Sequence, residues 1–120
     1  MRARRLAPLL LIGATIFGTT ALGAACSSKS TPNVAPEPKG DDAELVTGRT
    51  VFVANCQVCH GPRGQGGTGA RLAGVVTRSF PNLQNEINVV TNGAGAMPAW
   101  GGKLTEAEIR AVVRYTREVL

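Results

Sequence analysis

Two cysteines and a histidine stand together as Cys56, Cys59 and His60, in the order Cys-Gln-Val-Cys-His. Two thiols separated by two residues can add across the two vinyl groups on one edge of a haem, which forms two thioether bonds. The imidazole that follows directly can then bind the iron as an axial ligand, with its other ring nitrogen donating to a backbone carbonyl. This spacing is typical of a covalent haem attachment site.

A redox dithiol and a zinc site are the competing interpretations of the same residues. A thioredoxin-like dithiol would lie near a βαβ pattern, and no alternating strand pattern stands out in this sequence. A zinc site would need further ligands. His60 is the sole histidine, and the third cysteine, Cys26, lies in the N-terminal part of the chain. Residues 56–60 therefore predict one covalently attached haem c.

The sixth ligand of the iron has to come from another residue type, because a second histidine from this chain is excluded. Met97 is the only methionine besides Met1, and it lies in the run Asn-Gly-Ala-Gly-Ala-Met-Pro. The glycines permit a close backbone approach, and the proline favours an extended backbone at Met97. We expect the Met97 thioether to bind opposite His60. The alternatives are that Met97 fills a gap in the core or that Lys103 is the ligand.

The N-terminal residues 1–25 have the pattern of a signal peptide rather than of a core helix. Three arginines lie within the first five residues, and residues 6–25 carry no charge. The small residues before Cys26 are similar to the lipobox of bacterial lipoproteins, although Gly23 stands where a larger apolar residue is usual. Acylation of Cys26, ordinary cleavage and an uncleaved anchor stay open, since about 20 uncharged residues can span a bilayer. All three predict export, to the periplasm or the outer face of the cytoplasmic membrane.

Residues 26–40 predict a flexible linker, because they contain three prolines, three serines and no aromatic residue. Such a linker would tether the following domain, 41–120, to a membrane; if Cys26 is not acylated, a disordered tail with no role is an equal alternative. Residues 26–120 hold ten basic and eight acidic side chains, which gives a net charge of +2. Nucleic-acid binding therefore has no support.

Apolar periodicity predicts helices over residues 43–55, 83–91 and from 105 to the C-terminus, so the fold class is all-α. The third helix starts with a capping box formed by Thr105 and Glu108. The side chains expected to face the core are Val46, Phe52, Val53, Ile87, Val90, Ile109, Val112, Val113, Thr116 and Leu120. Gly48 would let another helix come close, and Arg110, Arg114 and Arg117 are expected to be exposed.

Residues 64–69 match the spacing Gly-x-Gly-x-x-Gly of dinucleotide-binding folds, but that fingerprint needs a preceding strand and a helix that begins within it. The haem motif precedes it here, so we interpret these residues as a flexible loop. Trp100 follows Met97 by three residues and is expected to form an apolar lid on that side of the haem pocket.

Residues 41–120 resemble class I cytochromes c, especially the short bacterial and photosynthetic type. Gly48 and Phe52 precede Cys56 at four-residue intervals, Gly-Pro follows the histidine, and Met97-Pro98 comes 37 residues after it. The resemblance implies a small cytochrome c fold, with three to four helices wrapped around one haem. The first and last helices would cross at Gly48 and Tyr115.

With both axial positions filled, no coordination site remains for oxygen or substrate. We therefore expect a monomeric one-electron carrier, not an enzyme, that exchanges electrons with other redox proteins. One alternative is a haem subunit permanently bound to a larger dehydrogenase or terminal oxidase. The other is a haem sensor or peroxidase-like enzyme, in which Met97 would have to leave the iron.

Overall fold

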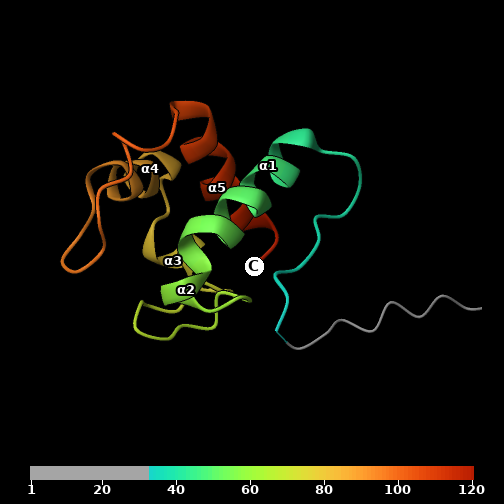
Figure 1. Ribbon diagram of the computed structural model, residues 1–120, viewed down its shortest axis with the longest axis horizontal. Helices are drawn as coiled ribbons and strands as arrows, with labels where there is room; N and C mark the ends of the chain where they lie inside the picture. The colour runs from blue at the N-terminus through green and yellow to red at the C-terminus, as the bar shows by residue number, and fades with distance from the viewer. Residues whose placement is uncertain (1–32) are drawn as a thin grey trace, which may run out of the picture.

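The computed structural model describes residues 33–120, so the predicted signal peptide, Cys26 and the first part of the linker lie outside the described residues. This part of the chain contains only helical elements and one isolated β-bridge, which confirms the all-α fold class. Its elements, shown in Figure 1, are α1 (Ala43–Val51), η1 (Phe52–Cys56), α2 (Gln57–His60), α3 (Val76–Ser79), α4 (Leu83–Asn92) and α5 (Glu106–Glu118).

The elements α1, η1 and α2 follow one another without a break and form one helical rod that ends at the haem motif (Figure 1). Asp42 caps the rod by accepting hydrogen bonds from the amides of Glu44 and Leu45. η1 has π-helical hydrogen bonding, in which the Gln57 amide donates to the Phe52 carbonyl five residues back. π-helical segments are often found at functional sites, and here the segment leads directly to Cys56.

The buried face of this rod differs from the predicted one. Phe52 is fully buried as expected, but Val46 and Val53 are exposed. Leu45, Gly48 and Val51 are buried instead. Leu45, Gly48 and Phe52 are spaced by three and four residues and therefore share a face, while Val46 and Val53 lie one residue further around the helix.

Helix α5 crosses α1 at Gly48, as the resemblance implied. A Cβ atom on Gly48 would clash with the Ala111 carbonyl and lie 2.8 Å from the Tyr115 Cβ, so only glycine fits at this position. Next to the crossing, the rings of Phe52 and Tyr115 pack at a centroid distance of 5.4 Å. The predicted capping box at Thr105 and Glu108 is confirmed. The predicted inward residues Ile109, Val112, Val113 and Thr116 are buried, and Leu120 is half-buried.

The predicted exposure of three arginines on α5 is right only for Arg110. Arg114 is half-buried and forms ion pairs with Asp42, Glu44 and Glu118, so it links the start of α1 to the end of α5. Arg117 is also half-buried and pairs with Glu86 of α4. Both side chains find acidic partners on other helices, which the spacing within α5 alone does not indicate.

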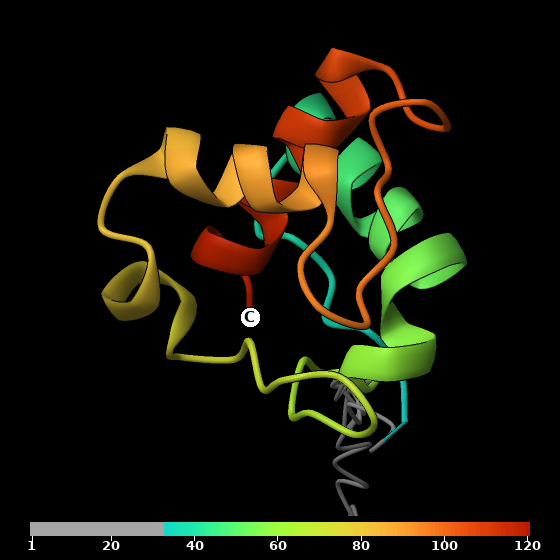
Figure 2. The ribbon, with the colours of Figure 1, turned by 90° about the vertical axis from the view of Figure 1, so that its left-hand side faces the viewer.

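The helix predicted for residues 83–91 is confirmed as α4, with Asn82 as its N-cap and with Ile87 and Val90 half-buried. Helix α4 packs on α5, and the long loop between α2 and α3 closes the lower side of the domain (Figure 2). The glycine-rich residues 64–69 lie in this loop, as predicted.

Residues 35–37, within the predicted flexible linker, pack against the helical domain. Ala35 is buried against the helix crossing, and the Tyr115 hydroxyl donates to the Pro36 carbonyl at 2.7 Å. Arg49 donates to the carbonyls of Ala35 and Pro36 and pairs with Glu37. The linker prediction over 26–40 is therefore wrong for residues 35–37, because these carbonyls find donors on α1 and α5. Within residues 33–120, no helix has the length and apolar character needed to cross a membrane.

We expect Gly48→Ala to lower the free energy of unfolding of the haem-loaded protein by about 3 kcal/mol, because overpacking at a rigid backbone contact costs roughly this much. Urea denaturation followed by circular dichroism measures the change. Gly102→Ala is the matched control, since a Cβ atom there meets nothing within 4 Å. Equal stability of the two variants would contradict the close crossing.

The carboxylate of Asp42 gives a second prediction, on pH dependence. Hydrogen bonds from Arg114 and from the Leu45 amide hold its pKa below the ordinary value of 3.8. A pKa that is lower in the folded state than in the unfolded state adds to the free energy of unfolding. This contribution is complete above the ordinary, unfolded-state pKa and is lost as the pH falls through the lowered pKa. Asp42→Asn keeps a capping side chain but loses the charge. We expect it to be less stable than the unsubstituted protein near neutral pH, and we expect this difference to become smaller as the pH falls below 3.8.

Urea denaturation at about pH 6 and about pH 3 measures this difference. Asp41→Asn removes the same charge from the exposed neighbouring residue and serves as the control. A stability difference between Asp42→Asn and the unsubstituted protein that does not change with pH would contradict the lowered pKa of Asp42.

Candidate cofactor site

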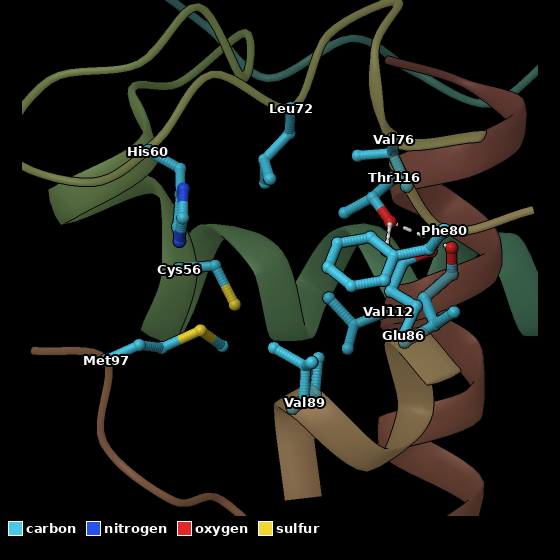
Figure 3. A pocket seen from close by; sticks show the side chains of 12 residues that line it. Cys56, His60, Leu72, Val76, Phe80, Glu86, Val89, Met97, Val112 and Thr116 are labelled. Atoms are coloured by element: carbon cyan, nitrogen blue, oxygen red, sulfur yellow. Dashed lines mark hydrogen bonds between the residues drawn. The ribbon is translucent and has the colours of Figure 1, made fainter. Parts of the chain in front are cut away.

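A cavity that is partly open to solvent lies between the end of the helical rod, the loops and helices α4 and α5. Cys56, His60 and Met97 lie on one side of it in Figure 3, and the side chains of α4 and α5 form the far wall. Most of the remaining lining is apolar: Leu72, Val76, Phe80, Val89, Val90 and Val112.

The two cysteines of the motif differ in their surroundings. Both are free thiols, and the Cys56 sulfur points into the cavity in Figure 3, whereas Cys59 is exposed. Burial, with the nearby Cys59, raises the pKa of the Cys56 thiol to about 11. The reactive cysteine of a redox dithiol has a lowered pKa, so this environment argues against a thioredoxin-like role.

The ring of His60 is fixed by one hydrogen bond to the loop that follows it. Its Nδ1 lies 2.7 Å from the Ala70 carbonyl oxygen, which can only accept, so Nδ1 carries the proton. This is the carbonyl contact expected from the sequence. The Nε2 atom keeps its lone pair, which is the state that a histidine needs to bind a metal ion.

The glycine-rich loop, residues 64–69, is fixed against His60 by backbone hydrogen bonds. It therefore differs from the flexible loop predicted from the sequence. The amides of Gly66 and Gly69 donate to the carbonyls of His60 and Cys59, both at 2.8 Å. A Cβ atom at Gly69 would lie 3.0 Å from the His60 ring. Glycine in this loop therefore lets the chain pass directly against the histidine.

Met97 is presented by a tight turn between α4 and α5. The Ala94 amide donates to the Met97 carbonyl, and the Met97 amide donates to the Ala94 carbonyl. The Trp100 amide donates to the Val90 carbonyl near the end of α4. Gly93 has a φ of 76°, and a Cβ atom there would lie 2.6 Å from the Met97 carbonyl oxygen. The turn thus depends on glycine and places the Met97 side chain in the same cavity as His60.

Trp100 and Lys103 do not line the cavity. Trp100 is half-buried, and the Lys103 ammonium lies over its ring at 5.1 Å from the centroid. Trp100, predicted as an apolar lid of the pocket, is therefore not among the residues that line the cavity. Of the two candidates for the second axial ligand, only Met97 lines the cavity.

The far wall of the cavity holds a polar cluster that was not predicted from the sequence. Glu86 of α4 is buried, accepts a hydrogen bond from Thr116 and pairs with Arg117. A signal was present in the sequence, since Glu86 lies between Leu83 and Val90 on the apolar face of its helix.

These donors fit a haem. A thiol directed into an apolar cavity, a second thiol three residues on, an imidazole with a free Nε2 lone pair and a thioether are what covalent attachment and His/Met ligation require. Among residues 33–120, no three His, Cys, Asp or Glu side chains are grouped so that they could hold a metal ion by themselves.

Comparison with known proteins identifies relatives of two kinds. Cytochrome c6 from Chlorolobion braunii is 35% identical over 80 residues, which cover 62% of this chain and 89% of that protein. The Cbb3-type cytochrome c oxidase subunit CcoP from Azospirillum is 33% identical over 91 residues, which cover 66% of this chain and 30% of the subunit. The chain therefore spans less than a third of that relative.

Solved structures show the same fold. Cytochrome CL from Methylophaga aminisulfidivorans superposes with a TM-score of 0.59 at 26% identity, covering 66% of this chain and 55% of that one. Cytochrome c6C from Synechococcus gives a TM-score of 0.50 at 32% identity, over 58% and 89% of the two chains. Residues 43–115 match the family model described as cytochrome C oxidase, cbb3-type, subunit III. With this match, the sequence resemblance is confirmed, and the chain belongs to the cytochrome c family.

Proposed function

We propose that this protein carries one electron at a time on one haem c that is covalently bound to Cys56 and Cys59. His60 and Met97 are its axial ligands. The observation that supports this best is that His60, at the end of α2, and Met97, in a turn 37 residues further along the chain, line the same apolar cavity into which the Cys56 sulfur points.

When bound, the haem supplies a one-electron couple between ferric and ferrous iron. The protein sets how readily that couple accepts an electron. The Met97 thioether and the apolar valines of the cavity favour the less charged ferrous state, so they raise the reduction potential. The Ala70 carbonyl holds the His60 ring in a fixed orientation. Two protein ligands leave no open position for oxygen or substrate, which favours a carrier over an enzyme.

Electrons would enter and leave where the motif reaches the surface. Cys59 is exposed, and Val58 beside it is 82% exposed, so an apolar contact is available next to the attachment site. Partners of a carrier dock through small interfaces that dissociate quickly. We propose that the carrier is exported as a monomer and tethered at the outer face of the membrane, by a lipid on Cys26 or by the uncleaved leader.

A haem subunit of a larger complex is the second candidate. The relatives named as Cbb3-type cytochrome c oxidase subunits CcoP and FixP favour it. The size of the native complex after mild solubilisation separates the two: a carrier migrates at the size of one chain, and a subunit migrates with a large redox enzyme.

Met97→Ala should abolish the weak long-wavelength absorption band that sulfur ligation gives to ferric haem. It should also let the ferrous protein bind carbon monoxide stoichiometrically at neutral pH, because one axial position becomes free. Optical spectra of the purified, haem-loaded protein measure both effects. Lys103→Ala is the matched control and should keep the band, since Lys103 lies over Trp100.

Two results would go against the proposal. Survival of the band in Met97→Ala would remove Met97 as the ligand. Rapid stoichiometric carbon monoxide binding by the unsubstituted ferrous protein would instead support a sensor or a peroxidase-like enzyme.

A further inference from the structure

A buried acidic side chain lies in the wall of the proposed haem cavity. Glu86 is 6% exposed and lines the cavity together with Thr116, on the side opposite Cys56 and Met97 (Figure 3). Its Oε1 accepts a hydrogen bond of 2.7 Å from the Thr116 hydroxyl, and its Oε2 lies 3.0 Å from Arg117. Electron transfer as proposed above does not require a carboxylate at this position.

The Thr116 hydroxyl has one proton and two acceptors within reach. Its oxygen lies 2.7 Å from the Glu86 carboxylate and 2.8 Å from the Val113 carbonyl. When Glu86 is ionised, the hydroxyl donates to the carboxylate. When Glu86 is protonated, the hydroxyl can donate to Val113 and accept from the carboxylic acid. The site is therefore hydrogen-bonded in both protonation states of Glu86.

Arg117 is the charged group that contacts Glu86 within residues 33–120. It also donates to the Phe80 carbonyl at 2.8 Å, so it keeps a partner when Glu86 is neutral. Phe80, from the end of α3, and Val112 and Val113, from α5, bring no further charge to the site. Burial raises the pKa of Glu86 above its ordinary value of 4.5, against the opposing effects of Thr116 and Arg117.

We infer that Glu86, in the electron carrier proposed above, couples the redox state of the haem to a proton: its carboxylate takes up one proton when the iron is reduced and releases it on oxidation. The inference rests on the proposed function, because it requires a redox-active haem in this cavity. One electron from a redox partner converts ferric to ferrous iron, and one proton from water adds to a Glu86 carboxylate oxygen. Oxidation gives the electron to a redox partner and releases the proton from Glu86 to water.

The sign of the coupling follows from the positions of the charges. Glu86 lines the cavity and Arg117 does not, so the pair has its negative end toward the haem. A negative charge in the wall of the haem cavity stabilises the ferric state, and removal of positive charge from the iron favours protonation of the carboxylate. The reduction potential therefore falls as the pH rises and Glu86 ionises.

The experiment is a spectroelectrochemical titration of the haem-loaded protein from about pH 4 to about pH 9, a range that brackets a raised glutamate pKa. Glu86→Gln should have the potential of the unsubstituted protein at the acid end and a higher one at the alkaline end. Comparing the two proteins cancels the titration of other groups. Thr116→Val should shift this transition to higher pH, because the carboxylate loses a hydrogen-bond donor. Glu106→Gln removes the same charge from the exposed first turn of α5 and should follow the unsubstituted protein.

Two results would overturn the inference. One is a difference between Glu86→Gln and the unsubstituted protein that is constant across the pH range. The other is an equal change in Glu106→Gln. If Glu86→Gln does not fold, the redox-difference infrared spectrum of the unsubstituted protein decides, since reduction within the transition must add the carbonyl stretch of a protonated carboxylic acid. A chain without haem shows no redox couple at all, so failure of the proposed function is distinguished from failure of this inference.

Discussion

The close contact between α1 and α5 at Gly48 is the constraint on which the rest of this domain depends. The two backbones meet where a side chain as small as that of alanine would clash with the Ala111 carbonyl. This contact fixes the rotation of α5, so that Val112, Val113 and Thr116 face the cavity. It also sets the direction of the helical rod that ends at Cys56 and His60. Arg114 reinforces the crossing at the N-terminal end of α1 through its ion pairs with Asp42 and Glu44.

Two loops complete the site, and both depend on backbone hydrogen bonds. The loop after His60 bonds back to the carbonyls of Cys59 and His60, and the turn at Met97 is joined to the end of α4. Glycines with positive φ or without room for a Cβ atom occur at the points of closest approach, such as Gly69 and Gly93. A small domain can thus hold the two proposed ligand side chains, His60 and Met97, in fixed positions without a strand to support them.

The sequence predicted best those features that depend on local spacing. The haem motif, the capping box at Thr105 and the helix at residues 83–91 each need only a few neighbouring residues, and the placement of the helix and capping box is confirmed. Glycine at position 48 was informative because the resemblance supplied the partner helix.

The predictions that failed depended on contacts between distant segments. The valines at 46 and 53 were assigned to the wrong face because α1 has valines on both sides. Arg114 and Arg117 pair with acids on other helices, and the Pro-rich segment is fixed by donors from α1 and α5. No periodicity in the local sequence contains this information. The burial of Glu86 depends on Arg117, which lies 31 residues away.

The central claim is that a haem is covalently attached at Cys56 and Cys59. Intact mass spectrometry of the protein, produced in a host able to mature c-type cytochromes, tests it most directly. We expect a mass increased by that of one haem, located by digestion in the peptide that contains both cysteines. A polypeptide of unmodified mass from such a host would contradict it.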